Sequence, residues 1–366
     1  MVVAGAGMDI ETKLGLIKQV GEEIITEEEL RQLLETKNHP IAYDGFEPSG
    51  VDIHIAQGIL RAINVNKMTK AGCKFKMFAA DWHAWANNKL DGDLEKIQAC
   101  GDYMIELWKA CGMDLDNIEF VRSSQLVNSQ DYWKRVLQIS RNATIQRIIR
   151  TGQIMGRKDA EVQQASQIIY PCMQAADIFQ LEADICQLGM DQRKVNILAR
   201  EIGHKLGYGK PVVVSHHMLM GLGEPKTSST DVTERAIELK MSKSKPDTAI
   251  FMTDSAEEIM KKISKAYCPD KKIEENPILE YCRYIIFERL DSLEIKRPEK
   301  FGGDLNVENY RELEKLYSEG KIHPMDIKGA VAEKLNELLE PVRKHFTTNT
   351  KAKKLREQVR TFNITR

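Results

Sequence analysis

The sequence predicts an α/β protein, in which a parallel sheet flanked by helices precedes an all-helical region. Short apolar segments alternate with amphipathic helical patterns over residues 26–217, and this alternation is typical of a parallel sheet with helices on both faces. From about residue 255 the strand pattern stops, and helical patterns continue to His345. The length of 366 residues is enough for two or three domains.

Composition excludes several classes of protein. Hydrophobic residues make up 42% and charged residues 29% of the chain, so most of it cannot be disordered. A net charge of -1 excludes a histone-like polycation. No apolar run approaches the roughly 18 residues that span a bilayer, and the N-terminus lacks the basic segment of a signal peptide. Seven scattered cysteines without a C-x-x-C pair indicate reduced thiols, a cytoplasmic location and no metal site.

The elements of the first half follow from their end signals. Thr26 and Glu29 have the spacing of a capping box, which predicts a helix that ends near Pro40. A strand is expected over residues 41–43, a helix over 58–70, a strand over 74–85 and a helix over 94–110.

The second half continues the alternation and then changes character. Strands are expected over 118–124, 183–189 and 211–217, with a helix from 191 to 201. We therefore predict a sheet domain over residues 1–238, a loop and linker over 239–254, and a helical domain over 255–366. The last 26 residues hold eight Lys or Arg and a single acidic residue, Glu357, so they form a basic tail.

A Gly- and Pro-containing turn separates the first strand from the following helix. Such a junction at the carboxyl edge of a parallel sheet is a common nucleotide site, because glycines allow close approach and helix N–H groups face phosphates. Gly45 and Gly58 bracket this junction, and His54 and Gln57 are expected in the first helical turn. A tight turn with a solvated histidine fits the same residues equally well.

Two further segments carry polar groups at suggestive spacings. Lys240, Lys243 and Lys245 lie within six residues and could neutralise a polyphosphate, although a solvated basic linker is the commoner explanation of such a loop. Tyr170, Gln174 and Asp177 share one face of an apolar helix. A buried carboxylate such as that of Asp177 needs a partner, so its role is either catalytic or structural. Asp191 and Gln192 follow a strand end and could bind a ribose and a polar substrate.

The order of these segments carries a resemblance. HIAQ at 54–57 and KMSKS at 240–244 resemble the HIGH and KMSKS signatures of class I aminoacyl-tRNA synthetases, with Gln57 in place of the second histidine. The flanking segments resemble tyrosyl-tRNA synthetases of the archaeal and eukaryotic cytosolic type; they are AYDGFEPSG, YPCMQAADI, LGMDQRK, IKRPEKFGGDL and HPMDIKGAVAEKL. The resemblance covers about residues 20–345.

The resemblance implies a Rossmann-like catalytic domain, a helical anticodon-binding domain and a two-step reaction. Tyrosine attacks ATP, which enters with Mg²⁺, to give tyrosyl-adenylate and pyrophosphate; the tyrosyl group then passes to the 3′ end of tRNA-Tyr. No tightly bound cofactor or resident metal is implied. Catalysis would rest on His54, Gln57, Lys240 and Lys243. The residues implied in binding ATP are Gly45, His54, Gly58, Asp191, Met218, Leu219, Lys240 and Lys243.

The resemblance also assigns the amino-acid and RNA contacts. Tyr43 and Asp177 would bind the phenol hydroxyl, Tyr170, Gln174 and Gln192 the α-amino group, and His83 would lie near the amino end. The residues implied in binding tRNA are Arg193 and Lys194 at the acceptor end, and Phe301, His323 and Asp326 at the anticodon. Residues 127–167 would form the interface of a homodimer.

Two alternatives share these signatures. A tryptophanyl-tRNA synthetase has the same fold, but it has no use for a Tyr43 and Asp177 pair around a phenol. An RNA-binding paralogue without activation chemistry would be expected to lose His54, Lys240 or Lys243, which are all present.

Overall fold

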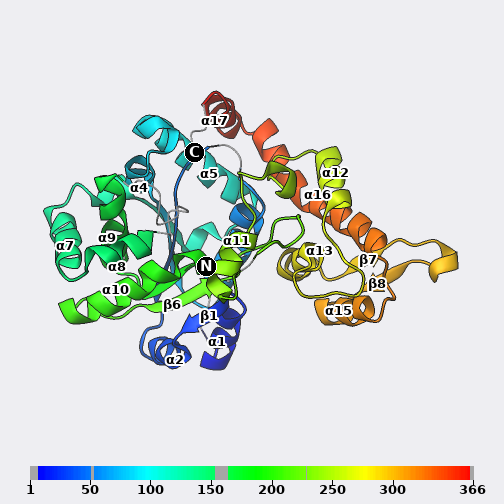
Figure 1. Ribbon diagram of the computed structural model, residues 1–366, viewed down its shortest axis with the longest axis horizontal. Coiled ribbons are helices and arrows are strands. Elements are labelled where there is room, and N and C mark those ends of the chain that lie inside the picture. The colour runs from blue at the N-terminus through cyan, green and yellow to red at the C-terminus, as the bar shows by residue number, and fades with distance from the viewer. Residues whose placement is uncertain (1–6, 51–52, 153–163, 228, 363–366) are drawn as a thin grey trace.

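A six-stranded sheet lies at the centre of the N-terminal region (Figure 1). This computed structural model describes residues 7–50, 53–152, 164–227 and 229–362. The spatial order of the strands is β1-β6-β5-β2-β3-β4. In chain order they are β1 (Gly21–Ile25), β2 (Ile41–Phe46), β3 (Lys74–Ala79), β4 (Ile118–Arg122), β5 (Ile185–Gly189) and β6 (Val212–His216).

All neighbouring strands are parallel except β1, which pairs antiparallel with β6 at the edge. The parallel arrangement confirms the predicted fold class. Strand β1 is not evident from the sequence, because GEEII is short and charged and none of its residues is fully buried. The carboxyl ends of β2, β5 and β6 meet at one edge of the sheet, where the chain order reverses between β2 and β5.

Helices cover both faces of this sheet (Figure 1). The helices of this region are α1 (Ile10–Lys18), α2 (Glu27–Thr36), the π-helical η1 (Ala56–Leu60), α3 (Arg61–Lys70), α4 (Asp81–Ala86), α5 (Leu94–Ala110), α6 (Ser123–Leu126), α7 (Gln130–Arg141), α8 (Ile145–Thr151), α9 (Ala165–Gln180), α10 (Arg193–Leu206) and α11 (Val232–Leu239). The predicted capping box of α2 forms, since the Glu29 N–H donates to Thr26 Oγ1 over 3.1 Å.

Side-chain alternation along β2 divides the interior into two cores. Ala42 and Phe46 belong to a core that includes α1, α3 and α5, whereas Tyr43 belongs to a second core with α7, α9 and α10. Successive strand residues point to opposite faces, so adjacent positions in the sequence serve different layers. Tyr43 thereby faces the same side as the apolar helix α9.

The strand expected over 74–85 is wrong beyond Ala79. The segment DWHAWA forms α4, so His83 lies on a helix and not on a strand. The buried Asp81 side chain accepts hydrogen bonds from Ser123 Oγ at 2.5 Å and from Gln98 Nε2 at 2.9 Å. This polar anchor holds the first turn of α4, and its partners lie too far along the sequence for periodicity to reveal it.

The C-terminal region is helical and extends to the right of the sheet in Figure 1. Its helices are α12 (Ala256–Lys265), α13 (Pro277–Tyr281), the π-helical η7 (Cys282–Ile286), α14 (Phe287–Arg289), α15 (Tyr310–Ser318), α16 (Pro324–Thr348) and α17 (Thr350–Arg360). The expectation that this region is helical throughout needs one correction, because β7 (Leu293–Ile295) and β8 (Leu305–Val307) form a hairpin. Strands of three residues are too short to give a periodic signal.

The basic tail comprises the end of α16 and the helix α17, which packs on the sheet region. Ala352 and Val359 of α17 are buried, and α17 lies beside α5 (Figure 1). Glu106 of α5 lies 3.1 Å from His345 Nε2 and 3.4 Å from Lys351 Nζ. Among the described residues, no helix is both long and apolar enough to cross a membrane.

Candidate active site

A cavity of about 410 Å³ opens at the carboxyl ends of β2, β5 and β6. Ligands of open α/β sheets bind at such a reversal point, because the loops diverge there and leave a crevice. The cavity gathers most of the predicted substrate residues; they are Tyr43, Gly45, His54, Gln57, His83, Tyr170, Gln174, Asp177, Asp191, Gln192, Met218, Leu219, Lys240 and Lys243.

Gly58 is the predicted ATP residue that does not line the cavity. A Cβ atom there would lie 2.3 Å from the Met252 sulfur, so a glycine is required for packing of η1. Gly189, at the end of β5, has a comparable role beside the cavity. Its Cβ would lie 2.5 Å from the Met218 sulfur and 2.7 Å from Asp191 Oδ1, so a side chain there would force these two residues to move.

Asp177 on α9 is the centre of a buried polar group. Its Oδ1 accepts a hydrogen bond from Tyr132 Oη at 2.9 Å, and its Oδ2 lies 2.9 Å from His83 Nε2. Asp177 is 1% exposed, as is Tyr43, whose hydroxyl makes no hydrogen bond of good geometry among the described residues. Burial raises the pKa of Tyr43 well above its usual value, and Asp177 adds to this, so the phenol is neutral.

His83 contacts residues assigned to both ends of the substrate. Its imidazole lies 2.9 Å from the Asp177 carboxylate, assigned to the phenol, and its ring centroid lies 5.0 Å from that of Tyr170, assigned to the α-amino group. Its expected place near the amino end stays a prediction. Burial lowers the pKa of His83, and the neighbouring Asp177 outweighs burial, so the net shift is upward. The imidazole, 2.9 Å from the carboxylate, is thus a buried polar partner of Asp177.

The remaining polar residues of α9 point toward two other elements. Tyr170 Oη donates a 2.6 Å hydrogen bond to Glu47 Oε1, which follows β2. Gln174 Nε2 donates to Gln192 Oε1 over 3.1 Å, so α9 and the turn after β5 meet at this point. The predicted set for an α-amino group is thus brought together, with Glu47 as an added carboxylate.

His54 lies before the helix and not in its first turn. It forms an isolated β-bridge with Phe251, and η1 begins at Ala56. Burial, followed by the charges of Lys243 and Lys240, lowers the pKa of His54 to about 3, so its imidazole is neutral at pH 7. A neutral imidazole donates a hydrogen bond to an incoming anion without a prior change of protonation.

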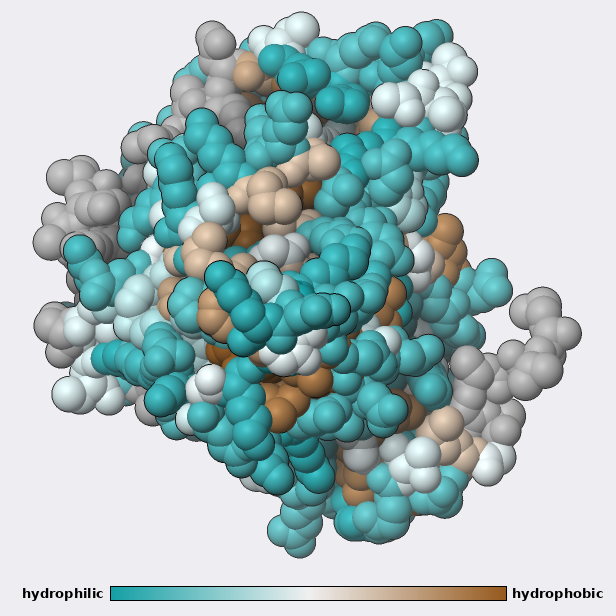
Figure 2. All heavy atoms as spheres, turned by 90° about the vertical axis from the view of Figure 1, so that its right-hand side faces the viewer, coloured by the Kyte–Doolittle hydropathy of each residue, from teal (hydrophilic) through white to brown (hydrophobic). Residues whose placement is uncertain are grey.

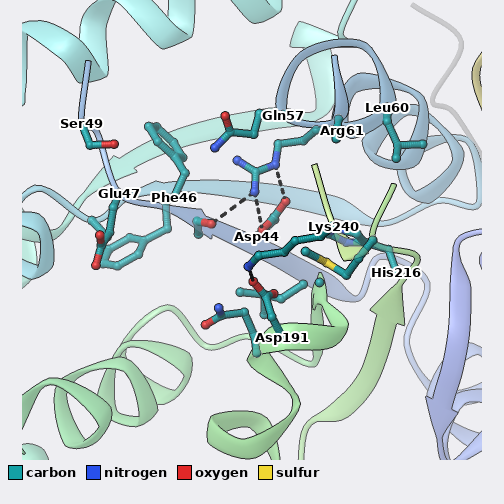
Figure 3. Close-up of a pocket in the computed structure, with 18 of the residues that line it drawn as sticks. Asp44, Phe46, Glu47, Ser49, Gln57, Leu60, Arg61, Asp191, His216 and Lys240 are labelled. Atoms are coloured by element: carbon teal, nitrogen blue, oxygen red, sulfur yellow. Dashed lines mark hydrogen bonds and ion pairs between the residues drawn. The ribbon is translucent and has the colours of Figure 1, made fainter. Parts of the chain in front are cut away.

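Lys240 reaches across the cavity from the loop to the end of β5 (Figure 3). Its Nζ lies 2.7 Å from Asp191 Oδ2. Burial opposes ionisation of Asp191, but Lys240 outweighs it and the pKa of Asp191 is lowered. The ion pair joins the cation assigned to phosphates and the acid assigned to the ribose, so both groups are already charged.

The comparisons with known proteins agree over nearly the whole chain. Residues 35–340 match the family described as tRNA synthetases class I (W and Y). The chain belongs to this family. It is 48% identical to tyrosine–tRNA ligase 1, cytoplasmic, of Arabidopsis thaliana, covering 98% of this chain and 90% of the relative. It is 43% identical to the tyrosine–tRNA ligase of Thermococcus kodakarensis, over 96% of this chain and 99% of the relative. The tyrosyl-tRNA synthetase of Pyrococcus horikoshii, solved with L-tyrosine, superposes with a TM-score of 0.87 at 40% identity. The match covers 96% of this chain and 100% of that structure.

Sequence reasoning missed an ion pair inside this class I synthetase cavity. Arg61 of α3 lies with its Nε 2.8 Å from Asp44 Oδ2, and both side chains line the cavity (Figure 3). Burial raises the pKa of Asp44 to about 6, against the effect of Arg61. The signal was present, since Asp44 is a charged residue inside a buried strand and needs a partner. The identity of that partner depends on how α3 crosses the sheet.

The predicted RNA contacts of the synthetase lie outside the cavity. Arg193 Nε lies 2.7 Å from Glu23 Oε2 of β1, and neither it nor Lys194 lines the cavity. At the end of the helical region, Phe301 is 61% exposed and Met325, beside Asp326, is 58% exposed. Arg297 Nη1 donates to the Lys321 carbonyl over 2.7 Å, which ties the hairpin loop of Phe301 to the turn before His323. Figure 2 views this end, where hydrophilic side chains cover most of the surface.

Proposed function

We propose that this protein is a tyrosine–tRNA ligase, which activates L-tyrosine with ATP and transfers the tyrosyl group to the 3′ end of tRNA-Tyr. The observation that carries the proposal is the buried Tyr43 and Asp177 pair in the cavity of a class I synthetase. A phenol hydroxyl supplies both a donor and an acceptor, and it would satisfy the Tyr43 hydroxyl and the Asp177 carboxylate together. A phenylalanine side chain would leave both groups without that partner.

The other half of the cavity is proposed to bind ATP. The neutral His54 would hydrogen-bond the α-phosphate as the tyrosine carboxylate attacks it. Lys240 and Lys243 would stabilise the charge on the departing pyrophosphate, with Mg²⁺ bound to ATP as part of the substrate. Asp191 would bind the ribose, and Met218 and Leu219 would contact the adenine. Because the substrate carboxylate is itself the nucleophile, the protein has to position and neutralise charge only.

The α-amino group of tyrosine would meet Tyr170, Gln174 and Gln192. Gln174 and Gln192 already contact each other, so a bound ammonium would replace or share that hydrogen bond. The carboxylate of Glu47, held by Tyr170, would add a counter-charge close to the same group.

For tRNA, we propose two contacts far apart on the molecule. Arg193 and Lys194 would bind the acceptor end beside the cavity. Phe301 would stack on an anticodon base, and His323 and Asp326 would read base edges, as is usual for unpaired RNA. The exposure of Phe301 supports this role, because a stacking platform must be open to solvent before RNA binds. In these terms residues 255–366 form an anticodon-binding domain after a catalytic domain (1–238) and the KMSKS linker (239–254).

We also propose a homodimer, formed through residues 127–167. Trp133, Leu137 and Ile145 lie in this segment and are 37%, 62% and 66% exposed, which supports a covered face. Residues 153–163 of the segment lie outside the described residues. A cytoplasmic location is proposed from the printed names of relatives such as that of Arabidopsis thaliana.

Tyrosine-dependent ATP–pyrophosphate exchange tests the proposal. We expect exchange with tyrosine and none of comparable rate with tryptophan or phenylalanine. Exchange that depends on tryptophan would instead identify a tryptophanyl-tRNA synthetase. Absence of exchange with every amino acid, together with retained tRNA binding, would identify an RNA-binding paralogue.

A further inference from the structure

The segment that follows β6 lies between the cavity and the helical region. Met218 and Leu219 line the cavity. On one edge the segment pairs with the base of the KMSKS loop, because the Met241 N–H donates to the Leu219 carbonyl over 2.7 Å and the Gly221 N–H donates to the Leu239 carbonyl over 3.0 Å. Met220 is thus the antiparallel partner of Lys240.

The opposite edge of the segment is bound by two side chains of α13. The Met220 N–H donates to Glu280 Oε2 over 3.0 Å, and Tyr281 Oη donates to the Met220 carbonyl over 3.0 Å. An antiparallel partner occupies only the groups on one edge of a strand, so the groups of Met220 would otherwise remain unpaired. Glu280 and Tyr281 therefore complete the hydrogen bonding of the residue that pairs with Lys240.

His217 fixes the Glu280 carboxylate in place. Its Nε2 lies 3.2 Å from Glu280 Oε2, and its Nδ1 lies 3.3 Å from Glu22 Oε2 of β1. The imidazole also stacks on Tyr284, with ring centroids 4.2 Å apart and an angle of 11° between the planes. The Tyr281 side chain is fully buried. These contacts leave the Glu280 carboxylate, which accepts from Met220, and the Tyr281 hydroxyl, which donates to it, little freedom to move.

From these contacts we infer that Glu280 and Tyr281 are positioning residues for ATP, which act by holding the 218–221 segment against the base of the KMSKS loop. The inference rests on the proposed assignment of ATP to this cavity. Neither residue lines the cavity, so their effect on ATP passes through Met220 with its strand partner Lys240 and, for Glu280, also through the cavity-lining His217. Among the described residues, no hydrogen bond or ion pair joins β2 or α9, which carry the proposed tyrosine pocket, to α13, so we expect tyrosine binding to be unaffected. The helical region thereby contributes to the first step of the reaction, before tRNA binds.

The full-length variants Tyr281→Phe and Glu280→Gln test this inference by the separation of two Michaelis constants. Tyr281→Phe removes one hydroxyl and keeps the buried ring, and Glu280→Gln keeps an acceptor for the Met220 N–H but removes the charge facing His217. We expect Tyr281→Phe to raise the KM for ATP in tyrosine-dependent exchange about five- to tenfold, with the KM for tyrosine changed less than twofold. Glu280→Gln should raise the KM for ATP about threefold.

Glu288→Gln is the matched control. Glu288 of α14 lies 2.7 Å from Lys67 Nζ of α3, so it also joins the helical region to the sheet region, but it does not contact residues 217–221. Its KM for ATP should equal that of the parent. The inference is overturned if both test variants leave the KM for ATP unchanged, if tyrosine and ATP constants rise equally, or if Glu288→Gln has the same effect.

Folding and the proposed function are checked separately. Thermal unfolding shows whether each variant is folded, and if Tyr281→Phe fails to fold, Glu280→Gln decides the question by the same criteria. Exchange by the parent protein is measured first. Its absence would contradict the proposed function, whereas an active parent with unchanged variants would contradict only the role of α13.

Discussion

The cavity and the far end of the helical region present their functional residues in opposite ways. In the cavity, Asp177 is almost fully buried and has two partners, and Lys240 is paired with Asp191. At the helical end, Phe301 and Met325 are more than half exposed. The cavity is thus organised before its ligand arrives, which suits electrostatic catalysis. The helical end instead exposes two large apolar side chains on a mostly hydrophilic surface (Figure 2).

The largest expected effect comes from breaking the buried group. Asp177→Ala would leave His83 and Tyr132 without their partner and remove the proposed acceptor of the phenol. Loss of one partner of a buried charged pair costs several kcal/mol, so we expect kcat/KM for tyrosine in ATP–pyrophosphate exchange to fall about 10³-fold. Tyr132→Phe, which leaves the carboxylate in place, is the control and should lose far less. Equal losses in the two variants would mean that Asp177 is a structural residue.

The next effect concerns the loop side of the cavity. If Lys243 contacts pyrophosphate mainly in the transition state, Lys243→Ala should lower kcat for exchange about 10²-fold, since one such contact is worth about 3 kcal/mol. The dissociation constant of tyrosine, measured by equilibrium dialysis, should change little. A similar loss in tyrosine affinity would show that the loop supports the whole cavity.

The contacts of His217 with Glu22 and Glu280 make the stability of the protein depend on pH. Burial opposes its charge, but Glu22 and Glu280 outweigh burial and raise the pKa of His217 to about 9, while the third neighbour, Tyr284, has a pKa raised to about 12 and stays neutral. A raised pKa stabilises the fold fully below pH 6.5 and loses this effect as the pH rises through 9. His217→Gln should therefore lower the free energy of unfolding more at pH 6.5 than at pH 9.5. The two losses should differ by up to about 3 kcal/mol. Urea titrations at the two values measure this, and a constant difference would show that His217 is neutral.

At the exposed end, smaller effects limited to tRNA are expected. Phe301→Ala should weaken charging of tRNA-Tyr about tenfold, the usual loss for one base stacked on an aromatic ring, and leave exchange unchanged. Asp326→Ala should reduce charging most for tRNA with the native G34, because base-edge contacts specify sequence. If Asp326→Ala charges native and G34-substituted tRNA in the parent ratio, the anticodon assignment is incorrect.

The smallest effect is expected from the basic helix α17. Deletion of residues 347–366 would also uncover the core beneath Ala352 and Val359, so charge removal is the cleaner change. The double variant Lys353→Gln, Lys354→Gln should weaken tRNA binding a few-fold, independently of the anticodon, with an effect that fades as salt rises. An effect that is insensitive to salt would rule out phosphate contacts.

Much of the fold follows from local patterns. The capping box of α2 and the parallel strands β2, β3 and β5 are all visible in the sequence. Three of the elements that were missed or misassigned, β1, α4 and the β7–β8 hairpin, depend on partners elsewhere in the chain. Short elements have weak intrinsic preference, and tertiary contacts decide their conformation.

The sequence by itself indicated many of the side chains that line the cavity, because its motifs give residue types in a fixed order, but not Asp44, Glu47 or Arg61. It could not determine how those side chains pair. The Arg61 and Asp44 ion pair, the His83 and Asp177 contact and the attachment of Met220 to α13 each join residues that are distant in sequence or on different elements. Such pairs form because buried charges and backbone groups must find partners, and which partner lies within reach depends on how the layers pack. Local patterns fix the faces of helices and strands, whereas the packing of those faces decides the chemistry between them.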